Sequence, residues 1–126
     1  MFRLTNFGVN IVALPLGGRS AERHWHKAQE EFVCVISGTL TIVNESGETR
    51  FTAGQSVGFK AGIPDGHMLV NNSTEVTVCL CVGDRTHPEH VTYPDIDIQL
   101  VSDEKGSRFL HNDGTPYPDE YLPKWG

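Results

Sequence analysis

Short runs of β-forming residues, separated by turn residues at intervals of about ten positions, set the strongest limit on the fold of this chain. The runs are rich in Val, Ile, Thr and Phe, and helical periodicity is hard to find. Such spacing is typical of an antiparallel sandwich or barrel, so we expect an all-β fold. Ser37-Gly38 and Glu45-Ser46-Gly47 have the composition of hairpin turns. The predicted strands are residues 9–14, 32–37, 39–44, 49–52, 67–71, 76–82 and 96–101.

Charge and hydropathy narrow the range of partners. Ten Lys and Arg against sixteen Asp and Glu give a net charge of −6, and no two basic residues are adjacent. Nucleic-acid binders need clustered cations to displace phosphate counterions, so we expect neither nucleic acid nor an anionic membrane as a partner. No stretch approaches the roughly 20 apolar residues of a membrane span, and residues 1–6 lack the basic-then-apolar run of a signal peptide. We therefore expect a cytoplasmic protein.

The three cysteines, Cys34, Cys79 and Cys81, are an odd number, and each lies in a predicted strand. We interpret them as reduced, packed thiols. Cys79 and Cys81 could bind a soft metal as i, i+2 neighbours, but packing is the interpretation that we adopt.

The composition changes after Gly83. Residues 84–126 hold five of the seven prolines together with several aromatic residues, which a disordered tail would lack. We predict an extended C-terminal arm with one strand over 96–101, wrapped over the chain's own barrel or over a partner subunit. The segment has too few branched aliphatic residues for a second core, so we expect one domain over 1–126, with its core at 9–83.

Three histidines and a carboxylate carry the predicted chemistry. His24 and His26 flank Trp25, and in a strand their side chains point to the same face. Glu30 and Glu31 precede the next apolar run, so a carboxylate there can reach the same ion. His67 opens a later strand-like run. Three imidazoles and one carboxylate would leave open positions on a six-coordinate metal, as metal-assisted chemistry needs.

The spacing of these residues resembles the first motif of the cupin superfamily. Gly18 is followed after five residues by His24-x-His26, after four more by Glu31, and after six more by Gly38. All five fixed positions match.

The second cupin motif is matched with departures. After Gly54 and five residues, the sequence reads Lys60-Ala61-Gly62, with lysine where the motif has proline. His67 then follows after four residues instead of two, and the closing His67-x3-Asn71 is intact. An alternative register through Gly58 leaves no gap before His67. The short separation between the two motifs, 39–53, is that of compact bacterial-type cupins.

The resemblance implies a jelly-roll barrel, or double-stranded β-helix, of two antiparallel sheets. It assigns the metal ligands to His24, His26, Glu31 and His67. Glu30 is the alternative carboxylate, and the six-residue spacing to Gly38 favours Glu31. The metal implied is one divalent transition ion, which in such proteins is Fe, Mn, Ni, Zn or Cu.

Residue parity predicts the pocket walls. If the ligands face inward, Val33, Leu69 and Asn71 share their side of the sheets and line a substrate pocket. The same parity turns Phe32, Cys34 and Ile36 outward, which suggests a face covered by the arm or by a second copy in a homodimer.

The sequence does not assign the catalytic residues. The resemblance favours a small metal-dependent enzyme that acts on a small organic molecule as a dioxygenase, an isomerase or a lyase. The alternative is a non-catalytic module that binds a small ligand. A metal-free sugar epimerase on a similar barrel is disfavoured, because a full set of metal ligands would be superfluous there.

Overall fold

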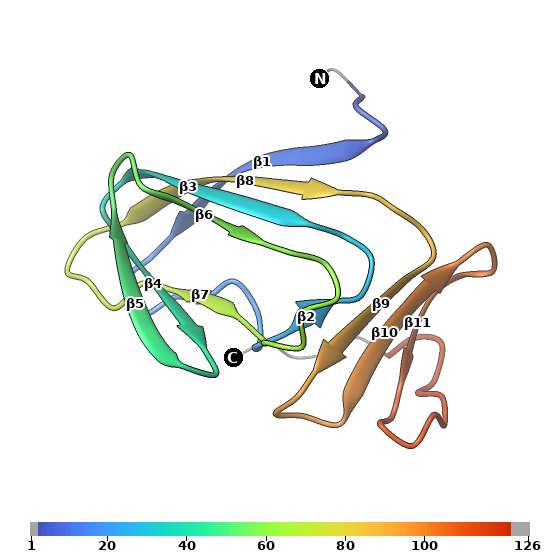
Figure 1. The fold of residues 1–126 in the computed structure, drawn as a ribbon. Helices are drawn as coiled ribbons and strands as arrows, with labels where there is room; N and C mark the ends of the chain where they lie inside the picture. The colour runs from blue at the N-terminus through green and yellow to red at the C-terminus, as the bar shows by residue number, and fades with distance from the viewer. Residues whose placement is uncertain (1–2, 122–126) are drawn as a thin grey trace.

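The computed structural model describes residues 3–121, and this part of the chain is built from strands alone (Figure 1). The all-β prediction is therefore confirmed. In chain order the strands are β1 (Phe7–Leu14), β2 (Trp25–His26), β3 (Glu31–Ser37), β4 (Thr39–Asn44), β5 (Gly47–Thr52), β6 (Ser56–Phe59), β7 (Met68–Val70), β8 (Thr77–Asp84), β9 (Glu89–Tyr93), β10 (Ile98–Asp103) and β11 (Gly106–Leu110).

Two antiparallel sheets form the barrel that the sequence predicts. One has the strand order β1-β8-β3-β6 and the other the order β5-β4-β7. Alternate residues of both sheets point between them, because side chains on a strand alternate in direction. They form the main core, in which Val35, Leu40 and Cys79 are almost completely buried. The other buried members of that core are Leu14, Val33, Ile42 and Leu69.

The connection at Ser37-Gly38 is not the hairpin that its composition suggests. The chain passes there from β3 in one sheet to β4 in the other. Gly38 has a φ of 82°, and a Cβ atom at this position would lie 2.7 Å from the carbonyl oxygen of Val76. The glycine is thus required for a sheet crossing, whereas the second predicted turn does close the β4–β5 hairpin, with Asn44 opposite Gly47.

The segment after Gly83 was predicted to be an extended arm with one strand, but it forms three strands of a sheet. It completes β8 and then forms β9, β10 and β11, which join β2 in a third sheet of order β11-β10-β9-β2 (Figure 1). This sheet has its own small core of Val91, Tyr93 and Ile98. β9 pairs with β2 of the same chain, and β2 contains His26. Residues 122–126 of the predicted arm lie outside the described residues.

The outward face of the first sheet is apolar, as parity predicts. Phe32 and Ile36 in β3 are 41% and 48% exposed, and Ile11 in β1, an edge strand of the same sheet, is 70% exposed. The three cysteines are free thiols, as expected. Residues 3–121 contain no helix that could span a membrane.

Candidate metal centre

Two strands and one backbone bridge bring the four predicted ligands together. His24 and His67 pair as a bridge, with each backbone N–H donating to the other's carbonyl oxygen at 3.0 and 2.8 Å. His26 lies in β2, two residues beyond His24, and so shares its side of the chain. Glu31 is the first residue of β3, which faces them from the first sheet. Segments distant in sequence therefore meet at one point.

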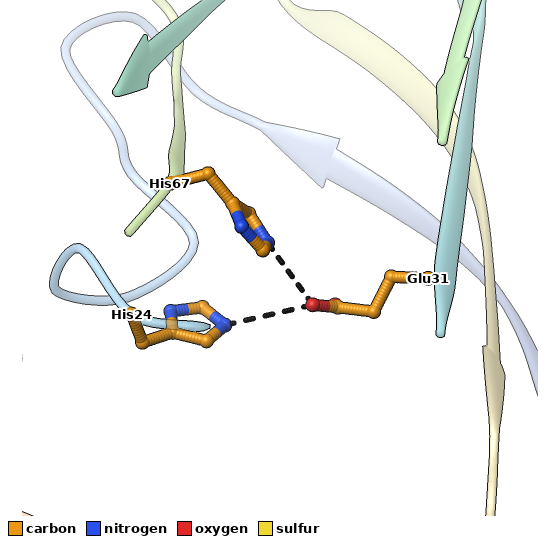
Figure 2. Close-up of side chains that lie close together, drawn as sticks. All are labelled: His24, Glu31 and His67. Carbon is orange, nitrogen blue, oxygen red and sulfur yellow. Dashed lines mark hydrogen bonds and ion pairs between the residues drawn. The ribbon is translucent and has the colours of Figure 1, made fainter. Parts of the chain in front are cut away.

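The histidine side chains converge on one oxygen of Glu31. Its Oε1 lies 2.9 Å from Nε2 of His26, 3.0 Å from Nε2 of His67 and 3.9 Å from Nε2 of His24. Figure 2 shows the rings of His24 and His67 directed at the carboxylate. Ligand atoms of His24, Glu31 and His67 all lie within 4.8 Å of one another, so this group could hold a metal ion.

Contacts on the far side of two rings fix which nitrogen faces the centre. Nδ1 of His24 lies 2.8 Å from the carbonyl oxygen of Glu22, which can only accept a hydrogen bond. Nδ1 of His26 lies 3.1 Å from a carboxylate oxygen of Glu89. In both residues Nδ1–H therefore donates outward, and Nε2 is directed at the centre. A lone pair on Nε2 is what a metal needs from a neutral imidazole.

The ionisation of His24 and Glu31 also favours ligation, whereas His26 must lose a proton before it can bind a metal. Burial lowers the pKa of His24, and the neighbouring imidazole of His67 acts in the same direction, so His24 is neutral near pH 7. Burial opposes charge on Glu31, but hydrogen bonds from His26 and His67 prevail and hold its pKa far below the usual range. His26 is also desolvated, yet its contacts with Glu31 and Glu89 raise its pKa. The site thus holds a carboxylate anion beneath three imidazoles.

The donors and their separations fit one divalent transition metal. Imidazole nitrogen and carboxylate oxygen suit such ions, and they bind at about 2.0–2.2 Å. Two ligand atoms at right angles on one ion at such distances stand about 3 Å apart. That is the separation of Glu31 Oε1 from the Nε2 atoms of His26 and His67.

Glu30 has a different role from Glu31. One carboxylate oxygen of Glu30 accepts a hydrogen bond from the backbone N–H of Ala61 at 3.3 Å, and its own backbone N–H donates to Asp84. The Glu31 carboxylate meets the histidines instead.

Two cavities meet at the ligand cluster, and both are lined by Glu31, Phe59 and His67. The first, which we call the Trp25 cavity, has a volume of about 290 Å³. Its polar lining includes Gln29, Asn44, Lys60 and Asp65, besides His26. The second, the Cys81 cavity, has a volume of about 270 Å³, and its lining includes Asn10 and Ser20.

The predicted pocket residues separate into two groups. Val33 and Leu69 line the Cys81 cavity. Asn71 lines neither cavity. It is completely buried, and its side-chain amide donates to the carbonyl oxygens of Leu14 and Glu75 at 2.9 and 2.8 Å. The prediction that Asn71 lines the pocket is therefore wrong, because its side chain ties the end of β1 to the loop after β7.

Sequence reasoning missed Glu89 and the polar residues Gln29, Asn44 and Lys60 that line the Trp25 cavity. The only local sign of Glu89 is a carboxylate between two histidines in His87-Pro88-Glu89-His90, a segment that reads as a polar loop. In the structure Glu89 is 5% exposed and begins β9. Its contact with His26 joins residues 63 positions apart, so no local pattern could predict it.

Several known proteins resemble this chain. A sugar phosphate isomerase of the cupin superfamily from Silicibacter pomeroyi is 38% identical, with a TM-score of 0.86 over 96% of this chain and 77% of that one. A putative sugar phosphate isomerase from Acidithiobacillus ferrooxidans is 28% identical, with a TM-score of 0.82 over 94% of this chain and 75% of that one. A Cupin 2 conserved barrel domain protein from Salinispora arenicola, 21% identical with a TM-score of 0.56 over 65% of this chain and 66% of that one, shares the fold.

A search of the curated proteins found no match. The family model described as the Cupin domain matches residues 10–83, which include all four candidate ligands. The fold, the histidine and carboxylate cluster and this match agree, and the chain belongs to the cupin family.

Proposed function

We propose that this cupin binds one divalent transition metal through His24, His26, Glu31 and His67 and isomerises a small phosphorylated sugar. The observation that carries the proposal is the convergence of three Nε2 atoms on one oxygen of Glu31, between two cavities. A metal bound there would act as a Lewis acid toward a carbonyl or hydroxyl oxygen of the substrate.

The substrate class is supported by the two neighbours that are 38% and 28% identical, of which the first is named a sugar phosphate isomerase and the second a putative one. The Trp25 cavity suits such a molecule. The side-chain amides of Gln29 and Asn44 can hydrogen-bond hydroxyl groups, and the exposed ammonium of Lys60 can pair with a phosphate. Trp25 supplies an apolar wall for a sugar ring.

Different residues around the centre serve in substrate binding and in proton transfer. Glu31 stays ionised because His26 and His67 hydrogen-bond it, so it is the anionic group beside the reacting carbons. Phe59 covers one face of the His67 ring and keeps water from it. Lys60 lines the same cavity and would hold the phosphate by charge-assisted hydrogen bonds.

An interconversion assay tests the proposal. The protein loaded with Mn²⁺, Zn²⁺ or Fe²⁺ is incubated with a panel of aldose and ketose phosphates, and aldose–ketose interconversion is followed by NMR in D₂O. We expect turnover with solvent deuterium in the product, and loss of turnover with excess chelator or in His67→Ala. Tight binding of a sugar phosphate that neither turns over nor responds to chelator would instead favour a non-catalytic binding module.

We also propose a homodimer formed through the outward face of the first sheet, where Ile11, Phe32 and Ile36 are exposed. Light scattering on the wild-type protein and on Ile11→Lys tests this. A wild-type monomer at micromolar concentration would exclude it. The cytoplasmic location and the single-domain organisation stay predictions.

A further inference from the structure

Glu89 is a buried acid whose four hydrogen bonds all come from the segment that carries the metal ligands or from its own neighbour. Its side chain is 4% exposed. One carboxylate oxygen accepts from the backbone N–H groups of Ala28 and His90, both at 2.8 Å. The other accepts from the backbone N–H of Gln29 at 3.0 Å and lies 3.1 Å from Nδ1 of His26. A carboxylate has lone pairs for all four donors, and a neutral amide does not.

This carboxylate determines how the His26 ring is presented to the centre. The ring bridges two acids, with Nδ1 at Glu89 and Nε2 at Glu31. Because a carboxylate can only accept, Glu89 holds the proton on Nδ1, and a metal that displaces the Nε2 proton shared with Glu31 finds the ring already presented by its Nε2 side.

The third sheet is what places Glu89. β9 begins at Glu89 and pairs with β2 in the register His26 opposite Val91 and Trp25 opposite Thr92. β9 lies outside residues 10–83, which the cupin family model matches. The segment appended to the barrel therefore reaches the candidate metal centre through Glu89 at His26, and also through Tyr93, whose ring centroid lies 5.6 Å from that of His24.

We infer that Glu89 is a positioning residue that fixes the tautomer and orientation of His26 and thereby strengthens metal binding at His24, His26, Glu31 and His67. The inference rests on the proposed function for the metal centre and adds a residue to it. Outer partners of this kind typically change metal affinity about 10–100-fold.

The substitution Glu89→Gln tests the inference because it conserves size and removes one acceptor. In one amide orientation its NH₂ group faces the N–H of Gln29 and Nδ1 of His26, which forces the proton of His26 toward Nε2. In the other orientation the N–H groups of Ala28 and His90 lose their acceptor. Either way the carboxylate's set of four bonds cannot be reproduced.

The matched control is Asp97→Asn. Asp97 forms the same kind of pair, with its carboxylate 2.7 Å from Nδ1 of His111, and it also accepts from the N–H of Asn112. Neither Asp97 nor His111 lines the two cavities at the centre. The control therefore removes a histidine–carboxylate pair of the C-terminal segment without touching the ligands.

The primary measurement is the Zn²⁺ dissociation constant by competition with a chromophoric chelator, with circular dichroism to verify folding. We expect Glu89→Gln to bind Zn²⁺ about 10–100-fold more weakly and Asp97→Asn to bind like the wild type. Equal affinity in Glu89→Gln and the wild type would overturn the positioning role alone. Equal weakening in both variants would also overturn it, because the effect would then be a general one.

A measurement on the wild-type protein keeps the inference testable if Glu89→Gln does not fold. In the zinc-loaded wild type we expect a slowly exchanging, downfield-shifted proton on Nδ1 of His26 in ¹H–¹⁵N spectra. A rapidly exchanging Nδ1 proton, or zinc bound through Nδ1, would overturn the role of Glu89. Absence of Zn²⁺ binding by the wild type would overturn the metal centre and this inference together. Failure of the metal centre is thus distinguished from failure of the role of Glu89, which leaves wild-type binding intact.

Discussion

The ring of Phe59 lies parallel to the imidazole of His67, with ring centroids 3.6 Å apart and planes inclined by 8°. Phe59 ends β6, directly opposite Glu31 in the β3–β6 register. The Phe59 side chain thus packs on the ring of His67, and Glu31, its partner in the β3–β6 pairing, is a second candidate ligand. The stack restricts rotation of His67 and shields it from water in both cavities, so it should matter for metal binding as much as for packing.

Replacing Phe59 should therefore weaken metal binding. We expect Phe59→Ala to raise the Zn²⁺ dissociation constant at least several-fold, since His67 gains freedom that binding must then remove. Phe59→Leu retains part of the cover and should lie between Phe59→Ala and the wild type. Chelator competition measures the effect. The same loss in Phe51→Ala, a core-packing residue that lines neither cavity, would show that general loosening is responsible.

The choice between two adjacent carboxylates gives the second prediction. Glu31→Ala should lower metal occupancy by at least tenfold, because it removes the oxygen on which the histidines converge. Glu30→Ala should bind nearly like the wild type, since Glu30 contacts the N–H of Ala61. Elemental analysis of the metal content of both variants after dialysis distinguishes the two carboxylates. The reverse order of effects would show that the wrong carboxylate is assigned.

His26→Ala and His67→Ala should each reduce metal occupancy as strongly as Glu31→Ala does, while the chain stays folded. The main core of the barrel contains neither residue, which is why folding should survive. Unchanged occupancy in both variants would exclude the ligand assignment.

The strands, the ligands and the contact of Glu89 could be predicted from the sequence to different extents. Runs of branched residues predicted the core strands well, and 39–44 matches β4 to the residue. β6, β9 and β11 were missed because residues such as Ser56, Gly58, Glu89 and Gly106 are poor or neutral strand formers that pairing with neighbours holds extended. The ligands were predictable because motif spacing is local along the chain. The contact of Glu89 with His26 depends on how the third sheet pairs, which periodicity does not reveal.

The stability of the metal-free protein should depend on pH through Glu31 and His26. Despite burial, hydrogen bonds from His26 and His67 hold the folded pKa of Glu31 below its ordinary 4.5, so its contribution is present above pH 4.5 and is lost as pH falls. Contacts with Glu31 and Glu89 overcome desolvation and raise the folded pKa of His26 above 6.5, so its contribution is present below pH 6.5 and is lost as pH rises.

The two effects together favour the range between about pH 4.5 and 6.5, where both groups are charged. Burial lowers the folded pKa of His24, which costs stability as pH falls below 6.5, so the predicted stability maximum of the metal-free protein lies toward the upper end of that range. Urea unfolding in the presence of a chelator, at half-unit pH intervals, measures it. Glu31→Gln removes the anion that the histidines share and should flatten the curve on both sides. A wild-type curve that keeps rising from pH 6.5 to 8 would contradict the coupling of Glu31 with His26.

Two glycines with nearly the same φ angle allow the sheet crossing to be tested. Gly38 and Gly54 have φ values of 82° and 88°, but only at Gly38 would a Cβ atom meet backbone, 2.7 Å from the carbonyl oxygen of Val76. Gly54→Ala should cost about 1–2 kcal/mol for the left-handed conformation. Gly38→Ala should cost clearly more, because β3 or β8 must also shift. Equal losses in denaturant unfolding would show that the close approach is unimportant.

Lys60 provides a test of the substrate class that is independent of the metal. Its exposed ammonium lines the Trp25 cavity, which the ligands His26, Glu31 and His67 also line. If this ammonium pairs with the substrate phosphate, Lys60→Met should raise KM for a sugar phosphate about tenfold or more, because charge-assisted hydrogen bonds are worth about 1.5–3 kcal/mol. The Zn²⁺ affinity should stay unchanged. Lys27→Met, at an exposed lysine outside both cavities, is the matched control. An unchanged KM in Lys60→Met would remove the phosphate from this wall of the cavity. A change of the same size in Lys27→Met would instead point to long-range attraction by the overall field, which rising ionic strength would abolish in both variants.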